Sequence, residues 1–164
     1  MRKILTLAIV LLAISIVTPG IAYAAAIRTE VTGTYSMTAT APGEIFVLKS
    51  GIMRQAGAEA SGPIVSSDPR VTGILEIVLY RVVNLNTGKG LGFGSFTVSN
   101  AGGTFEGRFT VKDTGFVSFE GAVEGHGTGA YEGLLVKFDM TGTDLTLVGG
   151  DSISASFTGS ILEP

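Results

Sequence analysis

The feature that most constrains this chain is a sustained alternation of apolar and polar residues near its start. Between residues 27 and 38, every second position carries Ile, Val, Gly, Tyr or Met, with one Thr, and the positions between them carry Arg, Glu, Thr or Ser. Successive side chains of a β-strand point to opposite faces, so this period of two predicts a strand with one buried face and one solvated face.

Similar segments follow along the chain and are separated by short turn sequences. Ala41-Pro42-Gly43, Asn86-Thr87-Gly88 and Asp113-Thr114-Gly115 each end in glycine, which adopts the positive φ that many tight turns need. No amphipathic helix of useful length lies between the segments, so a parallel sheet with crossover helices is not expected. Eight strands are expected, at residues 27–38, 44–49, 71–83, 91–98, 104–111, 116–123, 134–140 and 152–161.

Eight antiparallel strands in chain order favour an all-β fold, an eight-stranded up-and-down barrel of the calycin-like kind. Closure of the barrel leaves no exposed sheet edge. A two-sheet sandwich is the alternative. Residues 50–70 are rich in Ala, Gly, Ser and Pro and show no sustained period, so we expect a long loop there, with a short extra strand near Ile52. Loops of this length often cover binding sites, which makes this one a candidate lid.

Residues 1–24 have the features of a signal peptide. Arg2 and Lys3 precede an apolar run over residues 4–17, and Ala22-Tyr23-Ala24 supplies the small residues of a cleavage site. We therefore expect cleavage near Ala24, a secreted or extracytoplasmic protein, and membrane contact only through the leader. An uncleaved anchor is the alternative. Residues 25–164 then form a single domain, long enough to bury a core without disulfides.

The composition excludes most side-chain chemistry. The chain has no cysteine and one histidine, His126, so thiolate sites and multi-histidine metal centres are excluded, and we expect neither a metal nor a cofactor. Without Arg2 and Lys3 it keeps 9 basic and 14 acidic residues, a net charge of −5. An acidic domain is not expected to present the basic surface that binds the phosphates of nucleic acid, so nucleic-acid binding is not expected.

Two short motifs have plainer explanations than the sites they superficially match. Asp113-Thr114-Gly115 is the tripeptide of aspartic proteases, but Phe116 follows it where those sites continue with Ala or Ser, and the tripeptide suits a hairpin turn. His126 lies among glycines as in a phosphate-binding loop, yet a strand follows instead of the helix that such loops need. We interpret both as structural.

The predicted turns give the strands one shared interior face. A three-residue turn at Asn86-Thr87-Gly88 places Tyr80 opposite Gly94 and directs both Tyr80 and Glu76 inward. Glu76 is then the candidate polar or catalytic group at the mouth of the lumen, with a solvated position on the rim as the alternative. The residues expected to line the lumen and contact a ligand are Tyr35, Tyr80, Phe96, Phe109, Phe119, Phe138 and Phe157.

The same register leaves apolar side chains on the outside of the barrel. Soluble monomers seldom leave a large apolar patch in water, so we expect a homo-oligomer, a dimer or a trimer, or another covering surface. The residues expected in this patch are Leu75, Ile77, Leu79, Val83, Leu91 and Phe93.

Residues 127–133, Gly-Thr-Gly-Ala-Tyr-Glu-Gly, and residues 157–161, Phe-Thr-Gly-Ser-Ile, resemble the allene oxide cyclase and dirigent barrel group and its microbial relatives. The likeness covers roughly residues 70–162 and rests on the spacing of glycines and aromatic residues. It implies an eight-stranded antiparallel barrel with an apolar lumen, often assembled as trimers, whose plant members steer a reactive apolar intermediate toward one product. No catalytic residue of the group can be matched onto this chain, so an enzymatic role does not transfer.

Three functions remain open at this point. The first is an exported barrel that binds or shields a small apolar ligand in its lumen. The second is an isomerase or cyclase of the resembled group, which needs an acid or a pair of tyrosines inside the barrel. The third is a structural or surface-interaction module with a filled core. The volume of the lumen separates the third function from the other two, since a cavity below roughly 300 Å³ favours the third over binding of a drug-sized ligand.

Overall fold

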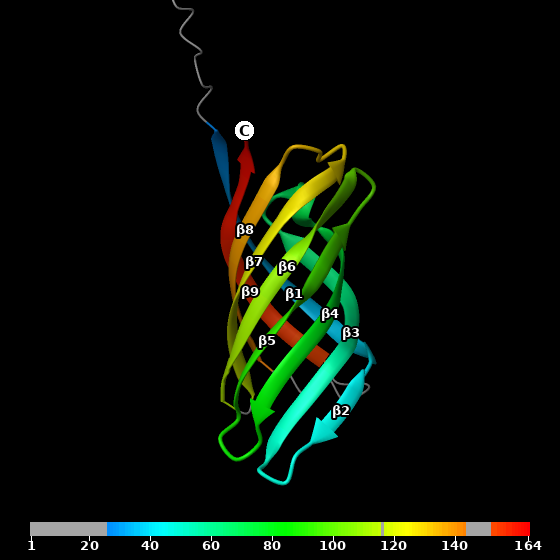
Figure 1. Cartoon of the computed structure of the whole chain (residues 1–164). Helices are drawn as coiled ribbons and strands as arrows, with labels where there is room; N and C mark the ends of the chain where they lie inside the picture. The colour runs from blue at the N-terminus through cyan, green and yellow to red at the C-terminus, as the bar shows by residue number, and fades with distance from the viewer. Residues whose placement is uncertain (1–25, 116, 144–151) are drawn as a thin grey trace, which may run out of the picture.

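A computed structural model describes residues 26–115, 117–143 and 152–164 (Figure 1). They form an all-β fold, a closed eight-stranded antiparallel barrel with one additional short strand, which confirms the predicted fold class. The predicted signal peptide and its cleavage site lie outside the described residues. No helix in the described ranges has the length and apolar character of a membrane span.

The wall of the barrel is one continuous sheet. From β3 to β9 each strand pairs with the next in the chain, β9 pairs with β1, and β1 pairs with β3 to close the circle. A short strand, β2 (Glu44–Val47), pairs with β3, and a 3-10 turn, η1 (Pro69–Val71), joins β3 to β4. The eight strands of the wall are β1 (Ile27–Ala41), β3 (Ile52–Ser66), β4 (Gly73–Asn84), β5 (Lys89–Ser99), β6 (Gly103–Thr114), β7 (Ser118–Gly129), β8 (Leu135–Thr143) and β9 (Ser152–Glu163).

The prediction of a long loop over residues 50–70 is wrong, because most of this segment is the 15-residue strand β3. Two of its inward side chains, Ala58 and Ala60, are small and almost completely buried, and Gly57 takes a φ of 70° where the register shifts. Small residues have a low strand propensity and give little periodic signal, whereas pairing with β1 on one side and β4 on the other holds the segment extended. The structure therefore has no lid here, and the strand expected at residues 44–49 is β2, outside the eight-stranded wall.

The turn between β4 and β5 has four residues, Leu85–Gly88, instead of the predicted three. The side-chain Oδ1 of Asn84 accepts a hydrogen bond from the Asn86 N–H at 2.9 Å, and the Asn84 carbonyl accepts one from the Gly88 N–H at 2.8 Å. These bonds make Asn84 and Lys89 the last cross-strand pair. One additional turn residue reverses the face of every side chain in the strand.

The orientation predicted for β4 is consequently wrong. Glu76 and Tyr80 point outward, not into the lumen. Of the six residues expected in an outer patch, only Leu91 and Phe93 of β5 lie on the outside. The other four, all on β4, point into the barrel: Leu75, Ile77, Leu79 and Val83.

Aromatic rings fill the interior by lying over glycines of the neighbouring strand. Phe157 of β9 lies over Gly33 of β1, and Phe119 of β7 lies over Gly142 of β8; each pair is directly opposite across the sheet. A Cβ atom at either glycine would collide with the ring. Glycines on the inner face therefore make room for large side chains in a narrow barrel.

Candidate functional site

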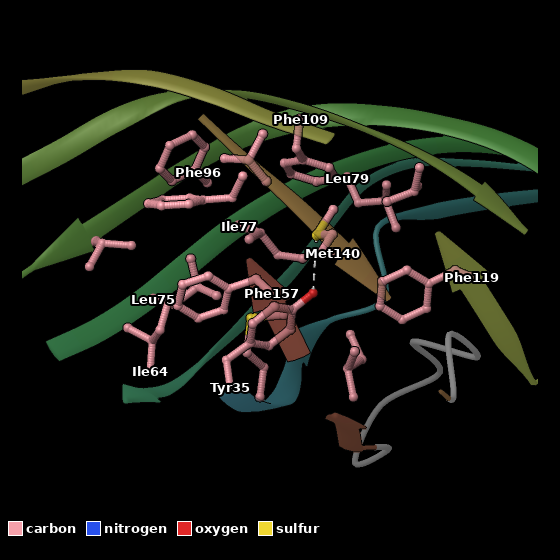
Figure 2. Close-up of a pocket in the computed structure, with 16 residues that line it drawn as sticks. Tyr35, Ile64, Leu75, Ile77, Leu79, Phe96, Phe109, Phe119, Met140 and Phe157 are labelled. Atoms are coloured by element: carbon pink, nitrogen blue, oxygen red, sulfur yellow. Dashed lines mark hydrogen bonds between the residues drawn. The ribbon is translucent and has the colours of Figure 1, made fainter. Parts of the chain in front are cut away.

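The lumen is a narrow apolar cavity of about 60 Å³ between the aromatic side chains of the wall (Figure 2). Strands from all sides of the barrel contribute to its lining. Of the seven residues predicted from the sequence, six lie in this lining: Tyr35, Phe96, Phe109, Phe119, Phe138 and Phe157.

The seventh predicted lumen residue, Tyr80, lies on the outer surface, where it is 43% exposed and stacks on Phe93. The ring centroids are 5.7 Å apart and the planes differ by 13°. Glu76 lies on the same outer face of β4 and is also exposed. Glu76 and Tyr80 therefore do not meet Tyr35 inside the barrel.

Tyr35 supplies the one hydroxyl group among the residues that line the lumen. Its O–H donates to the Sδ of Met140 at 3.3 Å, which is drawn as a dashed line in Figure 2. Burial raises the pKa of Tyr35 above its ordinary value, so the phenol stays protonated. A neutral phenol bonded to a thioether is poorly suited to act as a general base.

A buried polar cluster lies beyond the lumen at the end of the barrel that carries β2 and the β4–β5 turn. Its members are Gln55 of β3, Arg81 of β4 and Asp113 of β6, which are 2%, 6% and 5% exposed. The Arg81 Nε donates to the Gln55 Oε1 at 2.9 Å, and the Gln55 Nε2 donates to the carbonyl of Pro42 at 2.8 Å. The cluster therefore links β3 and β4 to the connection between β1 and β2.

Asp113 is the member of this cluster that lacks a hydrogen-bond partner, since both of its carboxylate oxygens are buried and unbonded. Burial raises the pKa of the Asp113 carboxyl, and the positive charge of Arg81 offsets part of that rise. The carboxylate occupies the space above Gly90, its cross-strand partner on β5, where a Cβ would collide with Oδ2. Asp113 is thus a buried acid close to the lumen.

Sequence reasoning missed Asp113 because its tripeptide was assigned to a turn. In the structure, Asp113 and Thr114 are the last two residues of β6, and Asp113 lies opposite Phe119 of β7. The alternation of β6 indicates the inward position of Asp113, because Phe109, Val111 and Asp113 share one face at a spacing of two residues. Extending that face by one step would have placed the carboxylate inside the barrel.

The single histidine of the chain, His126, lies on the surface. His126 of β7 is 3.4 Å from Glu106 of β6, between the His Nε2 and a carboxylate oxygen, and both side chains are more than half exposed. Within the described residues, no group of three or more His, Cys, Asp or Glu side chains is arranged to hold a metal ion.

An apolar patch lies on the outside of the barrel, over β4 and β5. Tyr80 and Val82 of β4 are opposite Phe93 and Leu91 of β5, and the four side chains are 43%, 46%, 62% and 67% exposed in that order. Phe46 of β2 is 58% exposed and lies in the same row as Val82, with one β3 residue between them. These five residues are called the outer patch below.

The chain matches no protein-family model, and comparison with curated proteins and with solved structures finds no match either. The resemblance to the allene oxide cyclase and dirigent group rests on the spacing of glycines and aromatic residues and stays a prediction.

Proposed function

We propose that this protein is a structural or surface-interaction module, a rigid barrel with a filled core whose outer patch binds a second copy of the chain. The observation that carries the proposal is the volume of the lumen. Its 60 Å³ is far below the roughly 300 Å³ of the smallest typical ligand pockets. The interior is therefore packed with side chains, as in small barrels that have no ligand cavity.

The outer patch supports the second part of the proposal. Single exposed apolar residues are common on soluble proteins, but four in adjoining positions, including a stacked aromatic pair, with a fifth, Phe46, on the far side of Arg54, are not. Aromatic residues are also enriched at the centres of protein interfaces. A second copy covers the patch with a surface of the same kind, since a two-fold dimer uses one surface on both chains.

The amino-terminal segment supports a proposal about where in the cell the protein acts. We propose that the protein is exported and acts outside the cytoplasm after cleavage near Ala24, because residues 1–24 combine basic residues, an apolar run and small residues in the order of a signal peptide.

A second candidate function is binding of a small apolar molecule in the lumen, favoured by a lining whose one hydroxyl belongs to Tyr35. The volume of about 60 Å³ limits such a ligand to a molecule far smaller than those that fill typical ligand pockets. A cyclase or isomerase has less support, since the acid or tyrosine pair that it needs does not line the cavity.

Sedimentation velocity on matched variants tests the proposal. Phe93→Asp places a charge in the outer patch, whereas Ile74→Asp places one on the same face of β4 outside the patch, at a side chain that is 50% exposed. We expect the parent and Ile74→Asp to sediment as oligomers and folded Phe93→Asp to sediment as a monomer. A monomeric parent, or an oligomeric Phe93→Asp, would refute the proposal.

A further inference from the structure

We propose that the protein docks on the surface of an anionic lipid membrane through the end of the barrel that carries β2. The contact is made by five side chains of the β2–β3 hairpin and the β4–β5 turn, called the apolar tip: Ile45, Phe46, Val47, Leu48 and Leu85. This contact is additional to the membrane contact expected of the leader. It does not depend on association of two copies, because the apolar tip shares only Phe46 with the outer patch.

The apolar tip is a cluster of exposed side chains at one end of the barrel, the lower end in Figure 1. Its five side chains are between 40% and 61% exposed. The two turns lie side by side, since the Leu85 N–H donates to the carbonyl of Gly51 in the β2–β3 turn at 2.8 Å. Large exposed apolar groups of this kind mark surfaces that bind a protein or a membrane.

β2 exposes apolar side chains on both of its faces. Successive residues of a strand point to opposite faces, so Ile45 and Val47 lie on one face and Phe46 lies on the other. All three side chains are exposed. A flat protein surface would cover one face of the strand and leave the other in water, whereas lipids surround a hairpin that enters their surface. The exposure of both faces therefore favours a lipid surface over a protein partner.

Basic residues around the apolar tip define the charge of that lipid surface. Lys49 lies in the β2–β3 turn, Arg54 on β3 and Lys89 at the start of β5. Their side chains are exposed and form no ion pair within the described part of the chain, whereas the exposed lysines of β6 and β8 pair with glutamates. Residues 44–54 and 84–89 hold these three basic residues and one acidic residue, a net charge of 3 − 1 = +2, in a chain of net charge −3. This local positive charge attracts anionic headgroups.

The length and pairing of β2 limit how deeply the apolar tip enters. Its four residues span about 13 Å, whereas the hydrocarbon core of a bilayer is about 30 Å thick. Among the described strands β2 pairs only with β3, so the backbone groups of its other edge need water. The apolar tip therefore docks at the level of the headgroups and reaches the boundary of the acyl chains.

A fluorescent label at a single cysteine tests the proposal in the full chain, which has no cysteine of its own. The apolar run over residues 4–17 is itself expected to bind lipid, so the label must report which part of the barrel meets the membrane. Val47→Cys places an environment-sensitive nitrobenzoxadiazole in the apolar tip, and Val65→Cys places it near the opposite end of β3. The two native side chains are 61% and 59% exposed, which makes the positions a matched pair.

The labelled proteins are mixed with vesicles of phosphatidylcholine alone or with about one third phosphatidylglycerol. On the vesicles with phosphatidylglycerol, we expect the emission of labelled Val47→Cys to move to shorter wavelength and that of labelled Val65→Cys to stay unchanged. No shift for Val47→Cys, an equal shift for Val65→Cys, or an equal shift on phosphatidylcholine alone would overturn the proposal.

Charge reversal tests the role of the basic residues in the labelled Val47→Cys protein. Lys49→Glu combined with Lys89→Glu should abolish most of the shift, because the apolar tip then repels anionic headgroups. Arg108→Glu combined with Lys137→Glu makes the same change in net charge at exposed positions of β6 and β8 and should leave the shift in place. A full shift after reversal at the apolar tip, or an equal loss in both double variants, would also contradict the proposal.

Discussion

Tyr80 of β4 and Phe93 of β5 stack on the outside of the barrel as direct cross-strand partners, with ring centroids 5.7 Å apart. Such a pair contributes about 0.5–1.5 kcal/mol beyond the area that it buries, yet both rings keep a large exposed surface. Under the proposed function, the aromatic residues outside the barrel meet a partner, and those inside stabilise the fold.

Phe157 should be a major source of stability. Its ring is 4% exposed, lies over Gly33 and packs against Phe138 at a centroid distance of 5.2 Å. Phe157→Ala should lower the free energy of unfolding by about 3–5 kcal/mol, because it leaves a large cavity. Phe93→Ala, at an exposed position, should lower it by no more than about 1.5 kcal/mol, the most that the stacked pair contributes, when both are measured by urea denaturation at monomeric concentrations. Equal effects of the two substitutions would contradict the assignment of Phe157 to a packed core.

Gly142 should not accept a side chain. A Cβ there would collide with the Phe119 ring and approach the Cβ of Ala155, so Gly142→Ala should destabilise the fold by about 1–3 kcal/mol. Gly115→Ala is the matched control, because the nearest atom to its Cβ would be the Ser118 Oγ at 3.5 Å. A change larger than about 0.5 kcal/mol is not expected at Gly115. If thermal or urea denaturation shows no difference between the two variants, the ring does not lie over Gly142.

Asp113 should make the stability of the protein fall as pH rises. Burial raises the pKa of its carboxyl in the folded state above the ordinary value of 3.8, so the folded chain holds a proton that the unfolded chain has already released. From about pH 3.8 upward, until the carboxyl is also ionised in the folded state, the free energy of unfolding should decrease relative to that of Asp113→Asn. The parent should therefore lose stability relative to the variant between acid and neutral pH.

The control for this prediction is Asp139→Asn, whose carboxylate is exposed on β8. Its stability should follow that of the parent across the same pH range. Urea denaturation at a series of pH values measures all three proteins, and a parent that gains stability relative to Asp113→Asn as pH rises would show that the carboxylate is well satisfied in the folded state.

Tyr35 should resist ionisation as long as the barrel is folded. Burial raises the pKa of its phenol, so an alkaline titration followed by tyrosine absorbance should show one tyrosine that ionises only on unfolding. Tyr35→Phe should remove that late step. The loss of one bond to the Met140 sulfur should cost no more than about 1 kcal/mol. Ionisation of Tyr35 together with exposed tyrosines would show that the lumen admits water.

The sequence predicted the barrel because most of its strands carry large apolar residues on one face. It missed β3, whose buried positions include Ala58 and Ala60, because small side chains give no clear period and the strand depends on pairing with β1 and β4. Pairing with these two neighbouring strands holds β3 in an extended conformation that its own residues do not predict. Such dependence on tertiary context is typical of strands.

Which side chains of β4 line the lumen depends on the length of the β4–β5 turn, and the residue types in the turn do not determine that length. The Asn84 side chain closes a four-residue turn, and this single additional residue moves Tyr80 from the predicted lumen to the outer patch. At β6, the alternation already indicated the inward face of Asp113, but its tripeptide resembled a turn. The hydrogen bond of the Asn84 side chain determines which face of β4 points inward. The position at which β6 ends determines that Asp113 belongs to the strand and not to the turn.

Cross-linking at the outer patch tests the central claim most directly, and a chain without cysteine makes the experiment clean. Leu91→Cys places a thiol in the patch, and Ile74→Cys places one on the outer face of β4 away from it. With a short bifunctional maleimide at low protein concentration, Leu91→Cys should give a covalent dimer and Ile74→Cys should remain a single chain. Equal cross-linking at the two positions, or none at Leu91, would contradict a contact between two copies through the outer patch.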